Sequence, residues 1–153
     1  RGLGDVYKRQ VFLYSFWDEG TDRNDIEQRF GLIDYHLQRK PAYFAVETAI
    51  KTIGDCKLVG PMPKIPLPSL GYVYQHKQNN DMVCVVWDGS GDRRGVFSTK
   101  AKVVTVVDLF GESKDVEPDA DGRFTITYGP SAVYLRAAQG IEYVSSEPLK
   151  SSR

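Results

Sequence analysis

Hydrophobic side chains form an almost continuous run at residues 11–17, which read VFLYSFW. A run that is apolar on both faces is typical of a strand in a parallel sheet that helices cover on both sides. Apolar residues then recur at three- and four-residue spacing over residues 43–53, after Pro41 and before Gly54. That spacing predicts an amphipathic helix that begins near Pro41 and ends at Gly54. Residues 11–55 therefore predict a strand, a long loop and a helix, which is the repeating unit of a βα barrel.

Beyond the predicted helix, the pattern changes to short alternating or β-branched runs. Turn sequences rich in Asn, Asp and Gly separate these runs. Their spacing predicts a small antiparallel β-sandwich over residues 70–144. The strand candidates lie at residues 72–75, 82–87, 95–98, 103–107, 123–128 and 132–135.

The segments on either side of this β-rich part have compositions of their own. Four of the fourteen residues 56–69 are proline, which predicts an extended linker. Residues 145–153 are polar and predict a flexible tail. The predicted fold class is therefore mixed but mainly β, with a strand–helix unit before an antiparallel sandwich.

The first ten residues, RGLGDVYKRQ, have no apolar period and join abruptly to the predicted strand. Codons for residues 4–10 can spell GGAGATGTGTATAAGAGACAG, the sequence of a common sequencing adaptor. We therefore interpret residues 1–10 as an adaptor-derived artefact outside the fold.

Composition narrows the classes of partner. Lys and Arg number 20 and Asp and Glu number 20, so there is no basic excess that would predict nucleic-acid binding. No apolar run reaches the roughly 20 residues of a membrane helix, so no membrane partner is expected. Cys56 and Cys84 are too few for a zinc framework, and either a disulfide between them or two buried free thiols fits the sequence.

Several short motifs occur in a fixed order around the predicted strand and helix. They are Tyr14-Ser15-Phe16, Asp18-Glu19-Gly20-Thr21-Asp22, Glu27, Phe30-Gly31-Leu32 and Lys40-Pro41-Ala42-Tyr43. Together they resemble the end of a (β/α)8-barrel glycoside hydrolase, in the retaining clan that includes the cellulase-like family 5 and the xylosidase-like family 39. In the β-rich part, residues 106–111 (VVDLFG) and 130–135 (PSAVYL) are similar to strand motifs of the small β-domain that follows such barrels.

The resemblance implies that residues 11–55 are the last strand–helix unit of the barrel. The implied activity is hydrolysis of β-linked oligo- or polysaccharides with retention, which uses one glutamate near the end of the fourth strand and one near the end of the seventh. Both would lie upstream of residue 11, so no catalytic residue is assigned in this chain and the chain alone is expected to be inactive. The implied partner is a carbohydrate, and no cofactor is implied. A secreted or periplasmic location is compatible with the resemblance, but the sequence leaves the compartment unknown.

The same resemblance points to Tyr14, Trp17, Asp18 and Glu19 as substrate-binding candidates, because sugar rings stack on aromatic rings at the end of the last barrel strand. Many relatives carry Trp at the position of Leu13, and Trp17 lies on the same strand face four residues later. Core filling by these aromatic residues remains an alternative. The acids of this loop are expected to be rim residues that are solvated or hydrogen-bonded, and their spacing lacks the pattern of a calcium loop, so no metal is expected.

A different class of function is also open. The β-sandwich could be an independent carbohydrate-binding module, or a purely structural one. An exposed row of coplanar aromatic rings would favour binding, whereas rings that point inward would favour a structural role. For Trp87 the sequence predicts an inward position.

Overall fold

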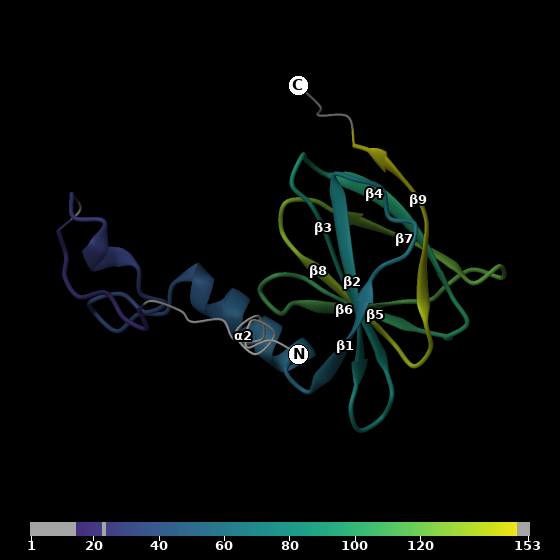
Figure 1. Ribbon diagram of the computed structural model, residues 1–153, viewed down its shortest axis with the longest axis horizontal. Coiled ribbons are helices and arrows are strands. Elements are labelled where there is room, and N and C mark those ends of the chain that lie inside the picture. Colours follow the sequence, from purple (N-terminus) through teal and green to yellow (C-terminus); the bar gives the residue numbers. More distant parts are fainter. Residues whose placement is uncertain (1–14, 23, 150–153) are drawn as a thin grey trace, which may run out of the picture. The chain divides into compact units, whose positions relative to one another are not determined.

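The computed structural model describes residues 15–22 and 24–149, and these fall into two compact units, unit 1 up to Phe44 and unit 2 from Ala45 on. The predicted adaptor residues 1–10, Tyr14 and most of the predicted strand 11–17 lie outside the described residues. Figure 1 shows the helix and the strands with their labels.

Unit 1 is held together by isolated bridges and one short 3-10 helix, η1 (Glu27–Arg29). Trp17 pairs with Ile33 in parallel, and Ile33 pairs with Arg39 in antiparallel orientation. Helix α2 (Pro41–Ile53) begins in unit 1 and continues into unit 2, with Pro41 in its first turn, where the missing N–H costs no hydrogen bond.

Unit 2 contains two antiparallel sheets (Figure 1). The six-stranded sheet has the order β1-β2-β3-β8-β5-β6, and the three-stranded sheet has the order β7-β4-β9. The strands are β1 (Cys56–Pro61), β2 (Ser69–His76), β3 (Met82–Asp88), β4 (Arg93–Thr99), β5 (Val104–Val107), β6 (Ser113–Val116), β7 (Arg123–Tyr128), β8 (Val133–Ala137) and β9 (Ile141–Pro148).

The core lies between the two sheets, as the alternation of buried and exposed residues predicts. Phe97 is its centre, with ring contacts to Phe124, Tyr128 and Tyr143 at centroid distances of 5.9, 6.2 and 5.8 Å. The six-stranded sheet contributes small and branched side chains to the same cluster: Cys84, Val86, Val104, Val106, Leu135 and Ala137.

The structure differs from the sequence-based boundaries at both ends of the sandwich. The first part of the predicted linker 56–69 is strand β1, which pairs with β2. Its proline, Pro61, is accommodated because β1 is an edge strand, where one N–H of the ladder needs no partner. At the other end, β9 continues to Pro148, inside the predicted tail 145–153, because its polar residues pair with β4.

Two tight turns of unit 2, between β5 and β6 and between β6 and β7, are built in the same way. Asp108 Oδ1 accepts hydrogen bonds from the main-chain N–H groups two and four residues later, and Asp119 Oδ1 does the same. The residue three positions after each aspartate has a left-handed main chain, and in both turns it is glycine: Gly111 (φ 92°) and Gly122 (φ 73°). The pattern Asp-x-x-Gly-x therefore specifies these turns, since glycine adopts positive φ without strain.

A buried carboxylate connects the two sheets at one end of the sandwich. Asp88 at the end of β3 is fully buried, and Ser69 Oγ donates to its Oδ2 at 2.6 Å. Ser90 donates to Oδ1 from its main-chain N and its Oγ at 2.8 and 2.6 Å, and Arg93 Nε lies 3.6 Å from Oδ2. Ser69 Oγ also lies 3.1 Å from the Tyr128 hydroxyl of the opposite sheet. The network thus satisfies a charge that could not otherwise be buried.

Candidate functional site

Three of the motif residues that are far apart in the sequence meet at a single carboxylate. Asp18 Oδ1 accepts a hydrogen bond from the Gly31 N–H at 2.8 Å and from Lys40 Nζ at 2.5 Å. Lys40 Nζ also donates to the Arg29 carbonyl at 3.0 Å. We call this contact the Asp18–Gly31–Lys40 junction, and it explains why the DEGTD, FGL and KPAY motifs occur together.

Glycine is required at the centre of this junction because the main chain of the preceding loop lies directly against it. A Cβ atom at Gly31 would lie 2.2 Å from the Trp17 carbonyl carbon and 2.3 Å from the Asp18 nitrogen. The Asp18 N–H donates to the Ile33 carbonyl at 2.9 Å, and the Leu32 N–H donates to the Phe16 carbonyl at 3.0 Å. The two segments therefore form a short ladder that holds Trp17 and Asp18 in place.

Asp18 is a positioning residue rather than a solvated acid. It is buried, and the hydrogen bond from Lys40, together with that from Gly31, holds the pKa of its carboxyl below the ordinary value of 3.8, although burial acts in the opposite direction. Because the folded-state pKa is lowered, ionised Asp18 stabilises the junction fully above about pH 3.8, the ordinary pKa of the carboxyl. This stabilisation is lost as the pH falls through the lowered folded-state pKa.

A hollow of about 290 Å³ lies beside the junction, and its lining contains three of the four predicted site residues. Trp17 is 60% exposed to solvent, so the described residues do not bury it in a core, which was the alternative that the sequence left open. The other lining residues are Asp18, Glu19, Asp34, Tyr35 and Leu37. The fourth predicted residue, Tyr14, lies outside the described part of the chain.

Three other lining residues, Asp34, Tyr35 and Leu37, come from a hairpin tip that sequence reasoning did not single out. Asp34 Oδ1 accepts hydrogen bonds from the N–H groups of His36 (2.9 Å) and Gln38 (2.8 Å), which closes a tight turn. Tyr35 at its tip is 56% exposed and makes an edge contact with the His36 ring, with 5.8 Å between the ring centroids. The turn follows the same hydrogen-bond pattern as those at Asp108 and Asp119, but the sequence conceals it because residue 37 is leucine and not glycine.

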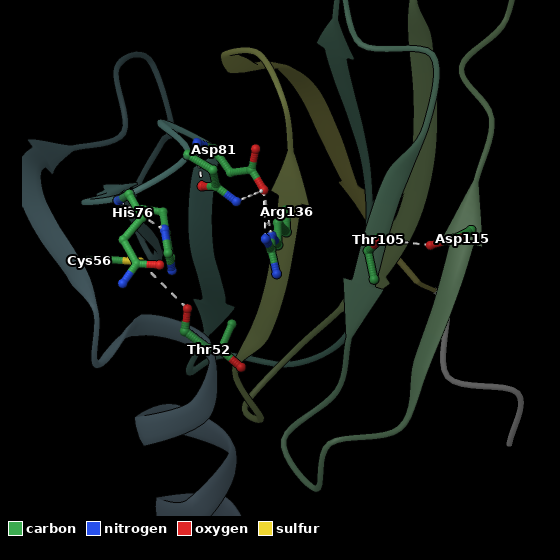
Figure 2. Close-up of polar contacts among 9 residues, drawn as sticks. Thr52, Cys56, His76, Asp81, Thr105, Asp115 and Arg136 are labelled. Carbon is green, nitrogen blue, oxygen red and sulfur yellow. Dashed lines mark hydrogen bonds and ion pairs between the residues drawn. The ribbon is translucent and has the colours of Figure 1, made fainter.

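A second cleft, of about 480 Å³, lies in unit 2 between the end of α2 and the six-stranded sheet. Figure 2 shows its main polar group, Arg136, whose Nε and Nη2 both donate to Asp81 Oδ2 at 2.9 and 2.7 Å. The other cation of the lining, Lys51, lies 3.3 Å from the Glu47 carboxylate. Both positive charges are thus neutralised by neighbouring acids, and the cleft presents no excess charge to a ligand.

The outer face of the six-stranded sheet carries aromatic side chains. Trp87 stacks on Tyr72 of the neighbouring strand, with 5.9 Å between centroids and 17° between ring planes. The predicted inward position of Trp87 is wrong. Its neighbour Asp88 occupies the inner position because of the hydrogen bonds of the buried network, and alternation then places Trp87 on the outer face.

The cysteines are both free, as in the second of the two possibilities that the sequence left open, but only Cys84 is buried as that possibility expected. Cys84 is buried, and burial raises its pKa to about 12, whereas Cys56 is half-buried with Sγ 3.6 Å from the Thr52 carbonyl oxygen (Figure 2). Across residues 15–22 and 24–149, no group of three or more His, Cys, Asp or Glu side chains could hold a metal ion. No helix in the same part of the chain is long and apolar enough to cross a membrane.

Comparison with known proteins gives one informative match. No family model and no curated protein matches the sequence. Among solved structures, the fold is similar to that of a family 39 glycoside hydrolase from the gut symbiont Bacteroides cellulosilyticus WH2, with a TM-score of 0.65 and 17% sequence identity. The match covers 80% of this chain and 25% of that chain, so this chain spans about a quarter of the length of its structural neighbour. The chain therefore has the fold of part of a glycoside hydrolase, and the predicted fold class, mainly β with antiparallel sheets, is confirmed.

Proposed function

We propose that this chain is the C-terminal part of a retaining glycoside hydrolase that acts on β-linked oligo- or polysaccharides. In this proposal residues 11–55 are the last strand–helix unit of the barrel, and the sandwich is the β-domain that follows it. The two catalytic glutamates belong to the upstream part of the enzyme, and the chain by itself is inactive. Its contribution to the active site is the rim that Trp17, Asp18 and Glu19 form.

The observation that carries the proposal is the Asp18–Gly31–Lys40 junction. The motifs of the family resemblance make direct contact with one another, as expected if they were selected together to build one rim. The junction holds Trp17 exposed beside acidic side chains, and this combination suits sugars, since aromatic faces pack on C–H groups and carboxylates accept hydrogen bonds from hydroxyls. The likeness in fold to a family 39 glycoside hydrolase supports the same assignment.

Helix α2 offers independent support. The spacing of its apolar residues predicts that Ile50 lies on a buried face, yet Ile50 is 65% exposed and Thr48 is the buried residue of this helix. An amphipathic helix with an exposed apolar position is what the proposal requires, because in a βα barrel that face packs on the neighbouring elements.

The test of this function is the substitution Trp17→Ala in the longer enzyme that contains this chain. We expect kcat/KM for aryl β-glycosides to fall about tenfold or more, because a large apolar contact with the sugar is removed. Trp17→Phe retains a ring and serves as the conservative control. Unchanged substrate affinity and turnover in Trp17→Ala would show that Trp17 does not contact the substrate.

The stacked pair Tyr72–Trp87 on the outer sheet face favours a second candidate, a carbohydrate-binding module. The two aromatic sites lie in different units, so Tyr72→Ala and Trp17→Ala separate the two candidates when polysaccharide binding by both variants is measured. A loss of polysaccharide binding in Tyr72→Ala, with none in Trp17→Ala, would favour the binding module.

A further inference from the structure

The tip of the Asp34 hairpin contains a residue with a main-chain conformation that is unfavourable for any residue with a side chain. Leu37 has φ of 64°, in the left-handed region that branched side chains avoid. The corresponding positions of the two other turns of this type are Gly111 and Gly122. Among the described turns of this hydrogen-bond type, the left-handed position is glycine twice and leucine once, and leucine is disfavoured there on the order of tenfold relative to glycine.

Packing does not explain the leucine. Its side chain is 77% exposed, so it contributes little to a core, and an exposed leucine at a strained position is unfavourable on both counts. It does line the hollow that Trp17 and Tyr35 also line. A strained residue of this kind is typical of binding sites, where the ligand contact outweighs the strain.

The lining of the hollow selects the chemistry of the ligand. Its apolar walls are Trp17, Tyr35 and Leu37, and its acidic groups are Glu19 and Asp34, beside an Asp18 that Lys40 already neutralises. None of the described lining residues carries a positive charge. Carboxylates accept hydrogen bonds from hydroxyl groups and repel anions, so the hollow suits an uncharged polyhydroxyl ring and disfavours an acidic one.

We infer that the Asp34–Gln38 tip is a specificity element in which Leu37 and Tyr35 add apolar surface to the hollow that Trp17 also lines, and that it selects a neutral pyranose over a uronic acid. This inference rests on the proposed function and extends it to residues and a substrate class. With a volume of about 290 Å³, the hollow lies at the lower end of the range of about 300–1,000 Å³ for ligand sites, which suits a single sugar unit.

The test is a titration of the 153-residue chain with two matched probes, methyl β-D-glucopyranoside and methyl β-D-glucuronide, followed by the indole N–H resonance of Trp17. We expect saturable shifts with the glucoside at millimolar concentrations. We expect the affinity for the glucuronide to be lower by about fivefold or more. Glu19→Gln is expected to reduce that difference. Equal affinity for the two probes would overturn the selection by charge.

The substitution Leu37→Gly separates a ligand role from a structural one. Relief of the left-handed strain is expected to raise hydrogen-exchange protection of the Gln38 amide, which closes the turn, about tenfold, while affinity for the glucoside falls at least threefold. Leu37→Asn, which also tolerates positive φ but keeps a side chain, is the second variant and should weaken binding in the same way. Stronger protection with unchanged affinity in both variants would overturn the role of Leu37. If neither probe shifts the Trp17 resonance in the unsubstituted chain, the specificity element is overturned, whereas the proposed function is tested separately by Trp17→Ala in the longer enzyme.

Discussion

We expect Asp88→Ala to lower the free energy of unfolding of the sandwich by about 3–5 kcal/mol, the cost of breaking a buried charged network. The substitution leaves the Ser69 hydroxyl without its acceptor and leaves Arg93 without the carboxylate that neutralises it. Both belong to the network that connects β3 and β2 to the opposite sheet through Tyr128. Urea unfolding followed by circular dichroism measures the change.

The matched control for this substitution is Asp115→Ala. Asp115 also accepts a side-chain hydrogen bond, from Thr105 Oγ1 at 2.7 Å, but it is exposed on β6 (Figure 2). Water replaces the lost partner there, so the expected change is within about 0.5 kcal/mol. A loss below about 1 kcal/mol in Asp88→Ala, or equal losses in the two variants, would contradict the role of the buried network.

The same network sets a pH dependence. Burial raises the pKa of Asp88, but the hydrogen bonds from Ser69 and Ser90 and the charge of Arg93 outweigh burial and hold the pKa below the ordinary value of 3.8. Since the folded-state pKa is lowered, the stabilisation is present above about pH 3.8 and is lost as the pH falls through the folded-state value. Asp88→Ala should therefore weaken the dependence of unfolding on pH in the acidic range.

The second large effect is expected for Gly31→Ala, which places a Cβ atom 2.2 Å from the Trp17 carbonyl carbon. Main chain cannot yield as a flexible side chain does, so the Asp18–Gly31–Lys40 junction should open at a cost of about 3 kcal/mol or more. Hydrogen exchange should show the loss at the amides of Asp18 and Leu32, which donate across this contact.

Gly89→Ala is the control for the general effect of replacing glycine, because nothing lies within 4 Å of a Cβ atom at that position. Its effect on unfolding should be small. Normal protection of Asp18 and Leu32 in Gly31→Ala would contradict the close approach that defines the junction.

Strands with alternating buried and exposed residues could be predicted from the sequence. Strands that form for other reasons, such as pairing with a neighbouring strand, were missed. The pattern of residues 123–128, RFTITY, is buried at every second position and was visible directly. Strand β6, with three exposed residues and one half-buried one, has no such pattern and forms because β5 offers it a partner in a hairpin closed by Asp108. Strand β1 was obscured by its proline, which only an edge position permits.

The candidate site was found in part, and for identifiable reasons. Trp17, Asp18 and Glu19 follow from the resemblance to the end of a last barrel strand, and all three line one hollow. Tyr35 and Leu37 were missed because the turn that positions them lacks the expected glycine. That Asp18 pairs with Lys40, 22 residues later, could not be derived from spacing, since it depends on how the loop returns to the helix.

The most direct test of the central claim, that this chain is the end of a barrel hydrolase, is to sequence the gene upstream of the codon for Val11. The account predicts an open reading frame that continues upstream through further strand–helix units, with glutamates at the ends of the fourth and seventh strands. A gene that begins within a few codons of Val11 would contradict the assignment.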